Sequence, residues 1–213
     1  MTDIILDCWQ SCAESDGIIP IIPDGCRDLV LKYSVNEKPE WFFSPLQDHT
    51  REVAVTSGVL MKGYRLHPAV KIQESEILAN IDGKHLEEGD IRCLLNDFSV
   101  LERATEEALI CLSSDIDTVE QASRRLGMSQ RSLQRLLREQ TGKPPSFWLQ
   151  LARVRRTARN IQLVPSLAEL ADVSGYSDQA HMTREFQRWF RVSPARMRLG
   201  GAEFEQLLVP AFG

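Results

Sequence analysis

Two similar stretches near the C-terminal end of the chain decide the fold. The first is Thr118-Val-Glu-Gln-Ala-Ser-Arg-Arg-Leu-Gly-Met-Ser-Gln-Arg-Ser-Leu-Gln-Arg-Leu-Leu137, and the second is Ser166-Leu-Ala-Glu-Leu-Ala-Asp-Val-Ser-Gly-Tyr-Ser-Asp-Gln-Ala-His-Met-Thr-Arg-Glu-Phe186. Each begins with a hydroxyl residue, runs through a short amphipathic segment to a glycine, and restarts as a basic amphipathic helix. The copies are 48 residues apart at Gly127 and Gly175 but 49 apart at Arg135 and Arg184, because the second copy has one extra residue after its glycine. The pattern predicts two helix-turn-helix units, at about 118–138 and 166–188.

Both copies carry the start and stop signals of helices. A left-handed residue is expected at Gly127 and Gly175, since glycine adopts that conformation without strain. We expect Ser129 and Ser177 to cap the second helix of each unit. Each first helix is expected to begin with a capping box, in which a hydroxyl and a glutamine or glutamate three residues later satisfy each other's backbone groups. These boxes are Thr118-Val-Glu-Gln121 and Ser166-Leu-Ala-Glu169.

Further helices are predicted before and between the two units. The break Gly142-Lys-Pro-Pro145 ends the first unit, and a helix of about 15 residues is expected after it. A continuous helix would hold the two units at a fixed separation, unlike a flexible linker. Another helix is expected from about Val100 and ends at residues 113–117. The apolar faces of these helices are Phe147, Leu151, Val154, Ala158 and Ile161 for the first, and Leu101, Ala104, Ala108, Leu109 and Leu112 for the second.

The first half of the chain has the pattern of strands and turns. Residues 18–23, 28–35 and 41–43 are predicted strands, with a turn at Asp24-Gly25. Residues 52–66 suggest a further strand pair, with Gly58 or Gly63 as a bulge or turn, stopped by His67-Pro68. Residues 69–98 are acidic and are expected to hold one or two short helices. We therefore predict an α+β protein: a small β-rich domain, forming an antiparallel sheet or partial barrel, followed by an all-α domain.

Length and charge support this division. A chain of 213 residues fits one large domain or two small ones, and we place them at 1–98 and 99–213. Residues 1–112 hold 10 basic and 20 acidic side chains, whereas residues 113–199 hold 15 basic and 8 acidic ones, a local net charge of +7 in a chain of net charge −5. A basic excess confined to one segment is the expected footprint of a domain that binds nucleic acid.

The candidate DNA contacts lie on the second helix of each unit, which a helix-turn-helix presents to the major groove. Arginine pairs bidentately with guanine and glutamine with adenine, at about 1–3 kcal/mol of discrimination each. The competing interpretation is a solvated arginine, for example Arg135 paired with Glu139 for about 0.3–0.5 kcal/mol. The candidates are Gln130, Arg131, Gln134, Arg135 and Arg138 in the first unit, and Gln179, Ala180, His181, Thr183 and Arg184 in the second. Phosphate contacts are expected from Lys143, Arg153, Arg155, Arg156 and Arg159.

Residues 113–199 resemble the C-terminal DNA-binding domain of the AraC/XylS family of bacterial transcription regulators. The resemblance is carried by Leu126-Gly-Met-Ser-Gln-Arg-Ser-Leu-Gln-Arg-Leu-Leu137, Gly142, Arg153, Ala158, Leu167-Ala-Glu-Leu-Ala171, Gly175-Tyr-Ser-Asp-Gln-Ala-His-Met-Thr-Arg-Glu-Phe186 and Phe190-Arg-Val-Ser-Pro-Ala-Arg-Met-Arg198. It implies a seven-helix domain whose recognition helices enter successive major grooves. The family's contact positions match Gln130, Arg131, Gln134 and Arg135, and Gln179, Ala180, His181, Thr183 and Arg184.

The chain departs from that family at two positions. Leu137 stands where an aromatic residue is frequent, and Arg191 stands where glycine is usual. The N-terminal half is similar to the β-rich domain that precedes this module in one subgroup, through Pro23-Asp-Gly-Cys-Arg-Asp-Leu-Val30 and Gly63-Tyr-Arg-Leu-His-Pro68. The resemblance implies sensing of a small-molecule effector or dimerisation as a homodimer by that domain, and contact with RNA polymerase.

Other chemistry fits the sequence less well than DNA binding does. A zinc or thiol-sensing site from Cys8, Cys12, Cys26 and His67 lacks paired metal-ligand spacing, and Cys26 could instead be a buried small hydrophobe. Self-alkylation by one of the cysteines is a further alternative. Asp24 and Asp28 could form a carboxylate pair, but turn and cap hydrogen bonds are the simpler role. No phosphate loop or nucleophile elbow is present, so we expect no enzyme, no metal and no cofactor.

The sequence therefore predicts a sequence-specific regulator that binds double-stranded DNA. An acid near the start, no apolar run of about 18 residues and five cysteines favour a cytoplasmic protein without a membrane partner. The competing class is a ligand- or thiol-responsive module that uses its helices for protein contacts.

Overall fold

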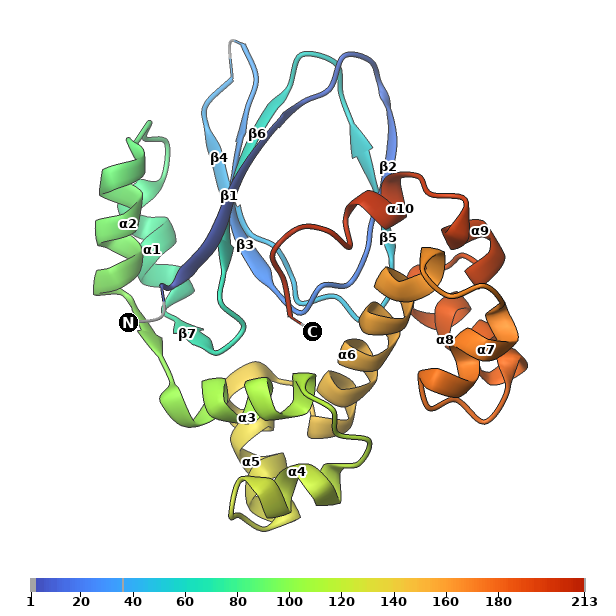
Figure 1. Cartoon of the computed structure of the whole chain (residues 1–213). Coiled ribbons are helices and arrows are strands. Elements are labelled where there is room, and N and C mark those ends of the chain that lie inside the picture. The colour runs from blue at the N-terminus through green and yellow to red at the C-terminus, as the bar shows by residue number, and fades with distance from the viewer. Residues whose placement is uncertain (1–2, 36, 213) are drawn as a thin grey trace.

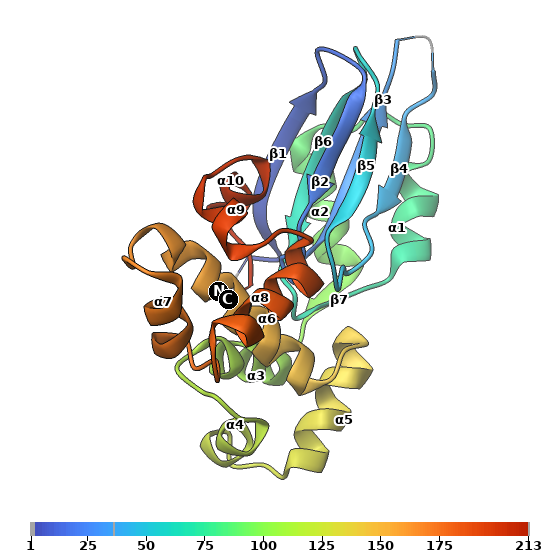
Figure 2. The same ribbon diagram turned by 90° about the vertical axis from the view of Figure 1, so that its right-hand side faces the viewer.

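The computed structural model describes residues 3–35 and 37–212. Its first part is β-rich. A four-stranded antiparallel sheet has the order β1-β6-β3-β4, formed by β1 (Ile5–Cys12), β6 (Leu60–Leu66), β3 (Arg27–Tyr33) and β4 (Glu40–Phe43). A separate antiparallel ribbon, β2 (Gly17–Ile21) with β5 (Arg51–Val55), faces this sheet (Figures 1 and 2). Among the described residues no hydrogen bonds join the ribbon to the sheet, so the strands form no closed barrel.

The predicted strands at residues 18–23, 28–35 and 41–43 correspond to β2, β3 and β4, and the turn between the first two places Gly25 at φ 77°. Residues 52–66 form two strands, as predicted, but the prediction that these two strands pair with each other is wrong. The two strands, β5 and β6, have different partners, since β5 pairs with β2 while β6 lies between β1 and β3. The long range of these pairings explains the error, because local pattern favours a hairpin between adjacent strands.

The two glycines of that segment have different roles. Gly58 lies in the turn between β5 and β6 at φ 75°, as expected for a turn. Gly63 is inside β6 and directly opposite Trp9 in β1. A Cβ atom at Gly63 would overlap the Trp9 indole, so the close approach of the indole requires glycine there.

Two helices cover the outer face of the sheet, away from the ribbon (Figure 1). They are α1 (Glu74–Ile81) and α2 (Glu88–Asp97), which confirms the short helices predicted for residues 69–98. Their apolar faces are fully buried against the sheet residues Leu29, Tyr64 and Leu66. The buried helix residues are Ile77, Ile81, Ile91 and Leu95.

The helix predicted from about Val100 begins later. Residues 99–101 form β8 (Ser99–Leu101), which pairs with β7 (Val70–Ile72), and α3 runs over Arg103–Ser113. Leu101 is therefore a strand residue, and Ala104 is exposed while Thr105 is buried. The rest of the predicted face, Ala108, Leu109 and Leu112, is buried as expected.

The C-terminal part is helical and contains both predicted units. The first is α4 (Val119–Arg125) with α5 (Gln130–Thr141), and the second is α7 (Leu167–Val173) with α8 (Gln179–Phe190). Between them runs α6 (Pro145–Arg159), followed by η1 (Asn160–Gln162). The five predicted apolar positions are all buried, four of them in α6 and the fifth, Ile161, in η1. Two short helices follow, α9 (Pro194–Arg198) and α10 (Ala202–Glu205). The fold class is thus confirmed as an α+β chain with a β-rich N-terminal region and two helix-turn-helix units joined by a helix.

The C-terminal segment, residues 206–212, runs back between the β-rich region and α6 (Figure 1). The Gln206 side chain donates to the Pro20 carbonyl at 2.6 Å and accepts from the Ile22 amide at 3.0 Å. The Phe212 amide donates to the Asp24 carbonyl at 3.0 Å, and its ring meets Trp148 of α6 edge-on. This segment therefore contacts both parts of the molecule.

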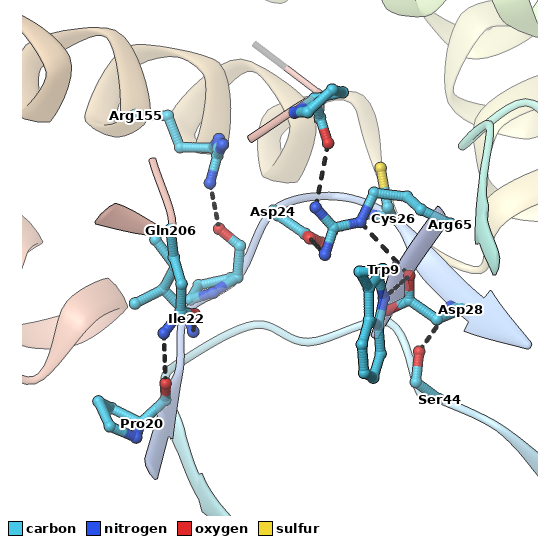
Figure 3. A network of polar contacts seen from close by, with 12 residues as sticks. Trp9, Pro20, Ile22, Asp24, Cys26, Asp28, Ser44, Arg65, Arg155 and Gln206 are labelled. Atoms are coloured by element: carbon cyan, nitrogen blue, oxygen red, sulfur yellow. Dashed lines mark hydrogen bonds and ion pairs between the residues drawn. The ribbon is translucent and has the colours of Figure 1, made fainter. Parts of the chain in front are cut away.

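A polar network at the same place links the β-rich region to the helices (Figure 3). Arg65 on β6 pairs with Asp24 at 3.0 Å and with Asp28 at 3.3 Å, and it donates to the Pro210 carbonyl at 3.1 Å. Asp28 also accepts from the indole of Trp9 at 3.3 Å. Asp24 accepts from the Cys26 amide at 2.9 Å, the predicted turn hydrogen bond. The two carboxylates therefore hold Arg65 and a turn in place.

Candidate DNA interface

The first helix-turn-helix unit has the capping that its sequence predicts. Thr118 accepts from the Gln121 amide at 3.2 Å, and the Gln121 side chain returns to the Thr118 backbone, which completes the capping box. Gly127 has φ 66° after α4. Ser129 accepts from the Ser132 amide at 3.1 Å and is the N-cap of α5.

The second unit follows the same plan with two corrections. Ser166 accepts from the Glu169 amide at 3.1 Å, but among the described residues the Glu169 side chain makes no return hydrogen bond, so the predicted capping box is only half formed. Gly175 has φ 73°. The predicted N-cap of α8, Ser177, is wrong: Asp178 is the cap, and its carboxylate accepts from the His181 amide at 2.6 Å. The extra residue of the second copy lies between Gly175 and the cap, so the helix begins four residues after its glycine rather than three.

Packing decides which face of each recognition helix remains free. In α5 the buried side chains are Leu133 and Leu137. In α8 they are Met182, Phe186, Trp189 and Phe190. Because these apolar stripes join the helical core, the opposite polar face of each helix is left toward solvent.

The polar face of α5 consists of exposed side chains without internal partners. Gln130, Arg131, Gln134, Arg135 and Arg138 are all exposed. Within the described part of the chain, the three arginine side chains make no ion pair or hydrogen bond, so the alternative pair between Arg135 and Glu139 is not formed. Three uncompensated guanidinium groups on one helix face form a strongly attractive surface for an anion.

The corresponding face of α8 is less uniform. Gln179, Ala180 and Arg184 are exposed, and Arg184 also has no internal partner among the described residues. His181 is half-buried, with its ring edge-on to Tyr176 and Nδ1 3.2 Å from the Ser177 hydroxyl. The Thr183 hydroxyl donates to the Gln179 carbonyl at 2.8 Å, so this hydroxyl is already engaged within α8.

The five side chains expected to contact phosphates all have partners within the protein, and one of them is fully buried. Arg155 is wrong as a phosphate contact, because it is fully buried and donates to the Pro23 carbonyl at 3.2 Å (Figure 3). Arg159 donates to the Leu207 carbonyl at 3.0 Å. Arg156 pairs with Asp115 at 3.1 Å, Arg153 donates to the Asp117 carbonyl, and Lys143 pairs with Asp48 at 3.1 Å. These side chains are therefore engaged within the protein, unlike the recognition-helix arginines.

Burial has a large effect on Arg155. Desolvation lowers the pKa of its guanidinium to about 10, and the nearby Asp24 carboxylate only partly opposes this effect. Asp24 itself pairs with Arg65, and Nε and Nη2 of Arg155 have no hydrogen-bond partner among the described residues. The residue lies on the side of α6 that faces the β-rich region, and no local sequence signal distinguishes it from the other arginines of this helix.

The alternative site at the cysteines does not assemble. No three His, Cys, Asp or Glu side chains of the described residues form a group that could hold a metal ion, so Cys8, Cys12, Cys26 and His67 are not brought together. Cys26 is buried, and burial raises the pKa of its thiol far above the usual range. No helix in residues 3–35 or 37–212 is long and apolar enough to cross a bilayer.

Comparison with known proteins gives the following matches. The family model described as a helix-turn-helix domain matches residues 122–199. No curated protein matches the chain. A transcriptional regulator from Chromobacterium violaceum, with an AraC-type DNA-binding domain, is 22% identical over 45% of this chain and 89% of its own, with a TM-score of 0.42.

Two further solved structures match over different lengths. The DNA-binding domain of AdpA, solved with a target DNA, is 30% identical over 45% of this chain and 86% of its own, with a TM-score of 0.38. ToxT from Vibrio cholerae is 10% identical over 91% of this chain and 97% of its own, with a TM-score of 0.47. The capped glycine turns, the free polar faces of α5 and α8 and the family match cover the same residues. The C-terminal part of this chain, residues 122–199, is thus identified as a helix-turn-helix domain, the kind of domain that the AraC/XylS resemblance implies.

Proposed function

We propose that this protein is a sequence-specific, DNA-binding transcription regulator that inserts α5 and α8 into successive major grooves. The observation that carries the proposal is the contrast between two groups of arginines. Those of the linker helix α6 are engaged inside the protein, whereas Arg131, Arg135, Arg138 and Arg184 are exposed and lack an internal partner in the described part of the chain. A protein-contact function gives no reason to leave three cations on α5 and one on α8 uncompensated, but a DNA groove does.

Within this proposal the residues have distinct roles. Arg135, Gln134, Arg184 and Gln179 read base edges, because guanidinium and amide groups pair bidentately with guanine and adenine. Arg131, Arg138 and Gln130, together with His181, Ala180 and Thr183, complete the two contact surfaces, with the Thr183 methyl and Ala180 suited to the methyl group of thymine. The two units begin their recognition helices at different distances from the preceding glycine, so we expect the two half-sites to differ in sequence.

The test is selection of duplexes from a random DNA pool, followed by binding of variants to the recovered site. Arg135→Ala and Arg184→Ala should each weaken binding to that site by about 5- to 150-fold, the equivalent of about 1–3 kcal/mol. The matched control is Arg103→Ala on α3, which removes the same charge from an exposed side chain already paired with Glu107. Equal losses in all three variants would reduce the effect to net charge and overturn the assignment of these helices.

The selected DNA site also bears on the role of the N-terminal region. We propose that residues 1–98 form a sensing or dimerisation domain and residues 99–213 the DNA-binding domain. A cavity of about 230 Å³ at the junction, lined among others by Leu66, His67, Val70, Thr141 and Trp148, supports a small-molecule effector. ToxT has been solved with an unsaturated fatty acid bound, which is a property of that protein. A recovered site with two-fold symmetry would support a homodimer, and an asymmetric one a single copy on DNA.

A further inference from the structure

One loop of the β-rich region contacts the C-terminal ends of both recognition helices. It comprises residues 44–50, between β4 and β5, and we call it the bridging loop. We propose that the bridging loop sets the separation of α5 and α8, and that it thereby specifies the distance between the two half-sites on DNA without touching DNA itself. This inference rests on the proposed function.

The contact with α8 is made by the last residue of the bridging loop. The backbone amide of Thr50 donates to the Trp189 carbonyl at 2.8 Å, and the Thr50 hydroxyl donates to the same oxygen at 3.1 Å. Trp189 is in the final turn of α8, where carbonyls lack a donor from their own helix. Thr50 is buried, so both hydrogen bonds are shielded from water and hold the end of α8 against the β-rich region.

The contact with α5 is made by Asp48. Its carboxylate accepts from the Lys143 ammonium at 3.1 Å, and hydrogen bonds from Lys143 and His49 hold the pKa of Asp48 below its usual range. Lys143 directly follows Gly142, the left-handed C-cap of α5 at φ 71°. The bridging loop therefore engages the first unit at the point where its recognition helix ends and the chain turns into α6.

Aromatic contacts close a ring between these two points. The Lys143 ammonium lies over the Phe147 ring at 5.0 Å, and the Phe147 ring contacts that of Trp189 at 5.3 Å. The chain of contacts thus runs from Asp48 through Lys143, Phe147 and Trp189 back to Thr50. A loop that touched only one helix would merely dock the β-rich region, but a closed ring fixes the two helix ends relative to each other.

The consequence concerns spacing on DNA. One inserted base pair moves the second half-site by about 3.4 Å along the helix axis and by about a tenth of a turn around it. A pair of recognition helices held at fixed separation binds one spacing much better than its neighbours. If the bridging loop provides part of that constraint, weakening it should broaden the range of spacings tolerated while each helix keeps its own half-site.

The experiment uses the full chain with Asp48→Asn and Thr50→Val together, which preserve shape but remove the charge and one of the two donors to Trp189. The matched control carries Asp16→Asn and Thr56→Val, at the far tip of the β-rich region, where Asp16 accepts from the Ser57 amide. Probes are the duplex recovered from the random pool, the same duplex with one base pair inserted between half-sites, and a duplex with one half-site. Affinities are measured by fluorescence anisotropy, and folding is checked by circular dichroism.

We expect the affinity ratio between the selected and the inserted duplex to fall about fivefold in the loop variant, as loss of one hydrogen bond implies. Single-half-site binding should stay within about twofold of wild type, and the control should keep the wild-type ratio. An unchanged ratio in the folded loop variant, or in Asp48→Asn alone should the double variant not fold, overturns this inference only. Failure of the wild-type protein to select any site overturns the proposed function and this inference together.

Discussion

Gly25 lies where the β-rich region, α6 and the C-terminal segment meet, and replacing it with alanine tests how tightly they are joined. Its φ of 77° is left-handed, which costs an alanine about 1–2 kcal/mol. A Cβ atom there would lie 2.6 Å from Cβ of Phe212, 3.1 Å from Cζ3 of Trp148 and 3.2 Å from Cδ2 of Leu151. Since ordinary carbon contacts are about 3.5–4.0 Å, at least one neighbour has to move by about 1 Å.

The matched control is Gly58→Ala. Gly58 has nearly the same φ, 75°, but a Cβ atom there would meet nothing within 4 Å. Both alanines gain about 0.4–1 kcal/mol from the lower entropy of the unfolded chain. The difference between the variants therefore isolates crowding at Gly25, for which we expect about 1–3 kcal/mol.

The assay is urea unfolding followed by circular dichroism, combined with hydrogen exchange of residues 206–212. Gly25→Ala should lower the free energy of unfolding by about 1–3 kcal/mol more than Gly58→Ala does. It should also remove the protection of the Phe212 amide, which donates to the Asp24 carbonyl. Equal losses of stability in the two variants, with the Phe212 amide still protected, would refute the claim that the junction at Gly25 is closely packed.

Three further expectations concern single side chains. Arg191 ends α8 at φ 60° and is the only non-glycine residue with positive φ among the described residues. Because glycine adopts this conformation without strain, Arg191→Gly should raise the free energy of unfolding by about 1 kcal/mol. The control Arg191→Ala should not raise the melting temperature. Asp178→Ala should cost about 1 kcal/mol in urea unfolding through loss of the α8 cap, and a comparable cost for Ser177→Ala would contradict the cap assignment. Burial raises the pKa of the Cys26 thiol, so its reactive thiolate is scarce at pH 8. An aromatic disulfide reagent should therefore label the exposed Cys93 at once but Cys26 only on unfolding. Equal labelling rates for the two cysteines would show that Cys26 is accessible.

The helical half was predictable because its signals are local. The capping residue Thr118 and the left-handed Gly127 act within a few residues of each other, and the apolar spacing of α6 is legible over four turns. The prediction that Ser177 is the N-cap of α8 is wrong because both Ser177 and Asp178 are residue types that can cap a helix. Only the start of α8, fixed by the packing of Met182, decides between them.

The β-rich half and its junction with the helices were less predictable because they depend on distant contacts. The sequence does not predict strand β1, which is defined by pairing with residues of β6 that lie 48 to 61 positions away. Arg155 has the same local surroundings in sequence as Arg156, yet it is fully buried and donates to the Pro23 carbonyl of the β-rich region. Arg155 lies on the face of α6 that packs against the β-rich region, whereas Arg153 and Arg156 lie on its partly exposed face, so the prediction of a phosphate contact is wrong at Arg155.

The pairing of β1 with β6 also has a consequence for how the chain reaches this structure. The central sheet requires Cys8 to meet Tyr64, whereas the contacts within α4–α5 and α7–α8 join residues close in sequence. Folding rates fall as contacting residues lie further apart along the chain, because the entropy of closing a long loop is lost before any contact compensates for it. We therefore expect refolding in two kinetic phases. A fast phase would restore helical circular dichroism, and a slower one, reported by protection of the β1 and β6 amides against hydrogen exchange, would restore the sheet and with it the attachment of α6.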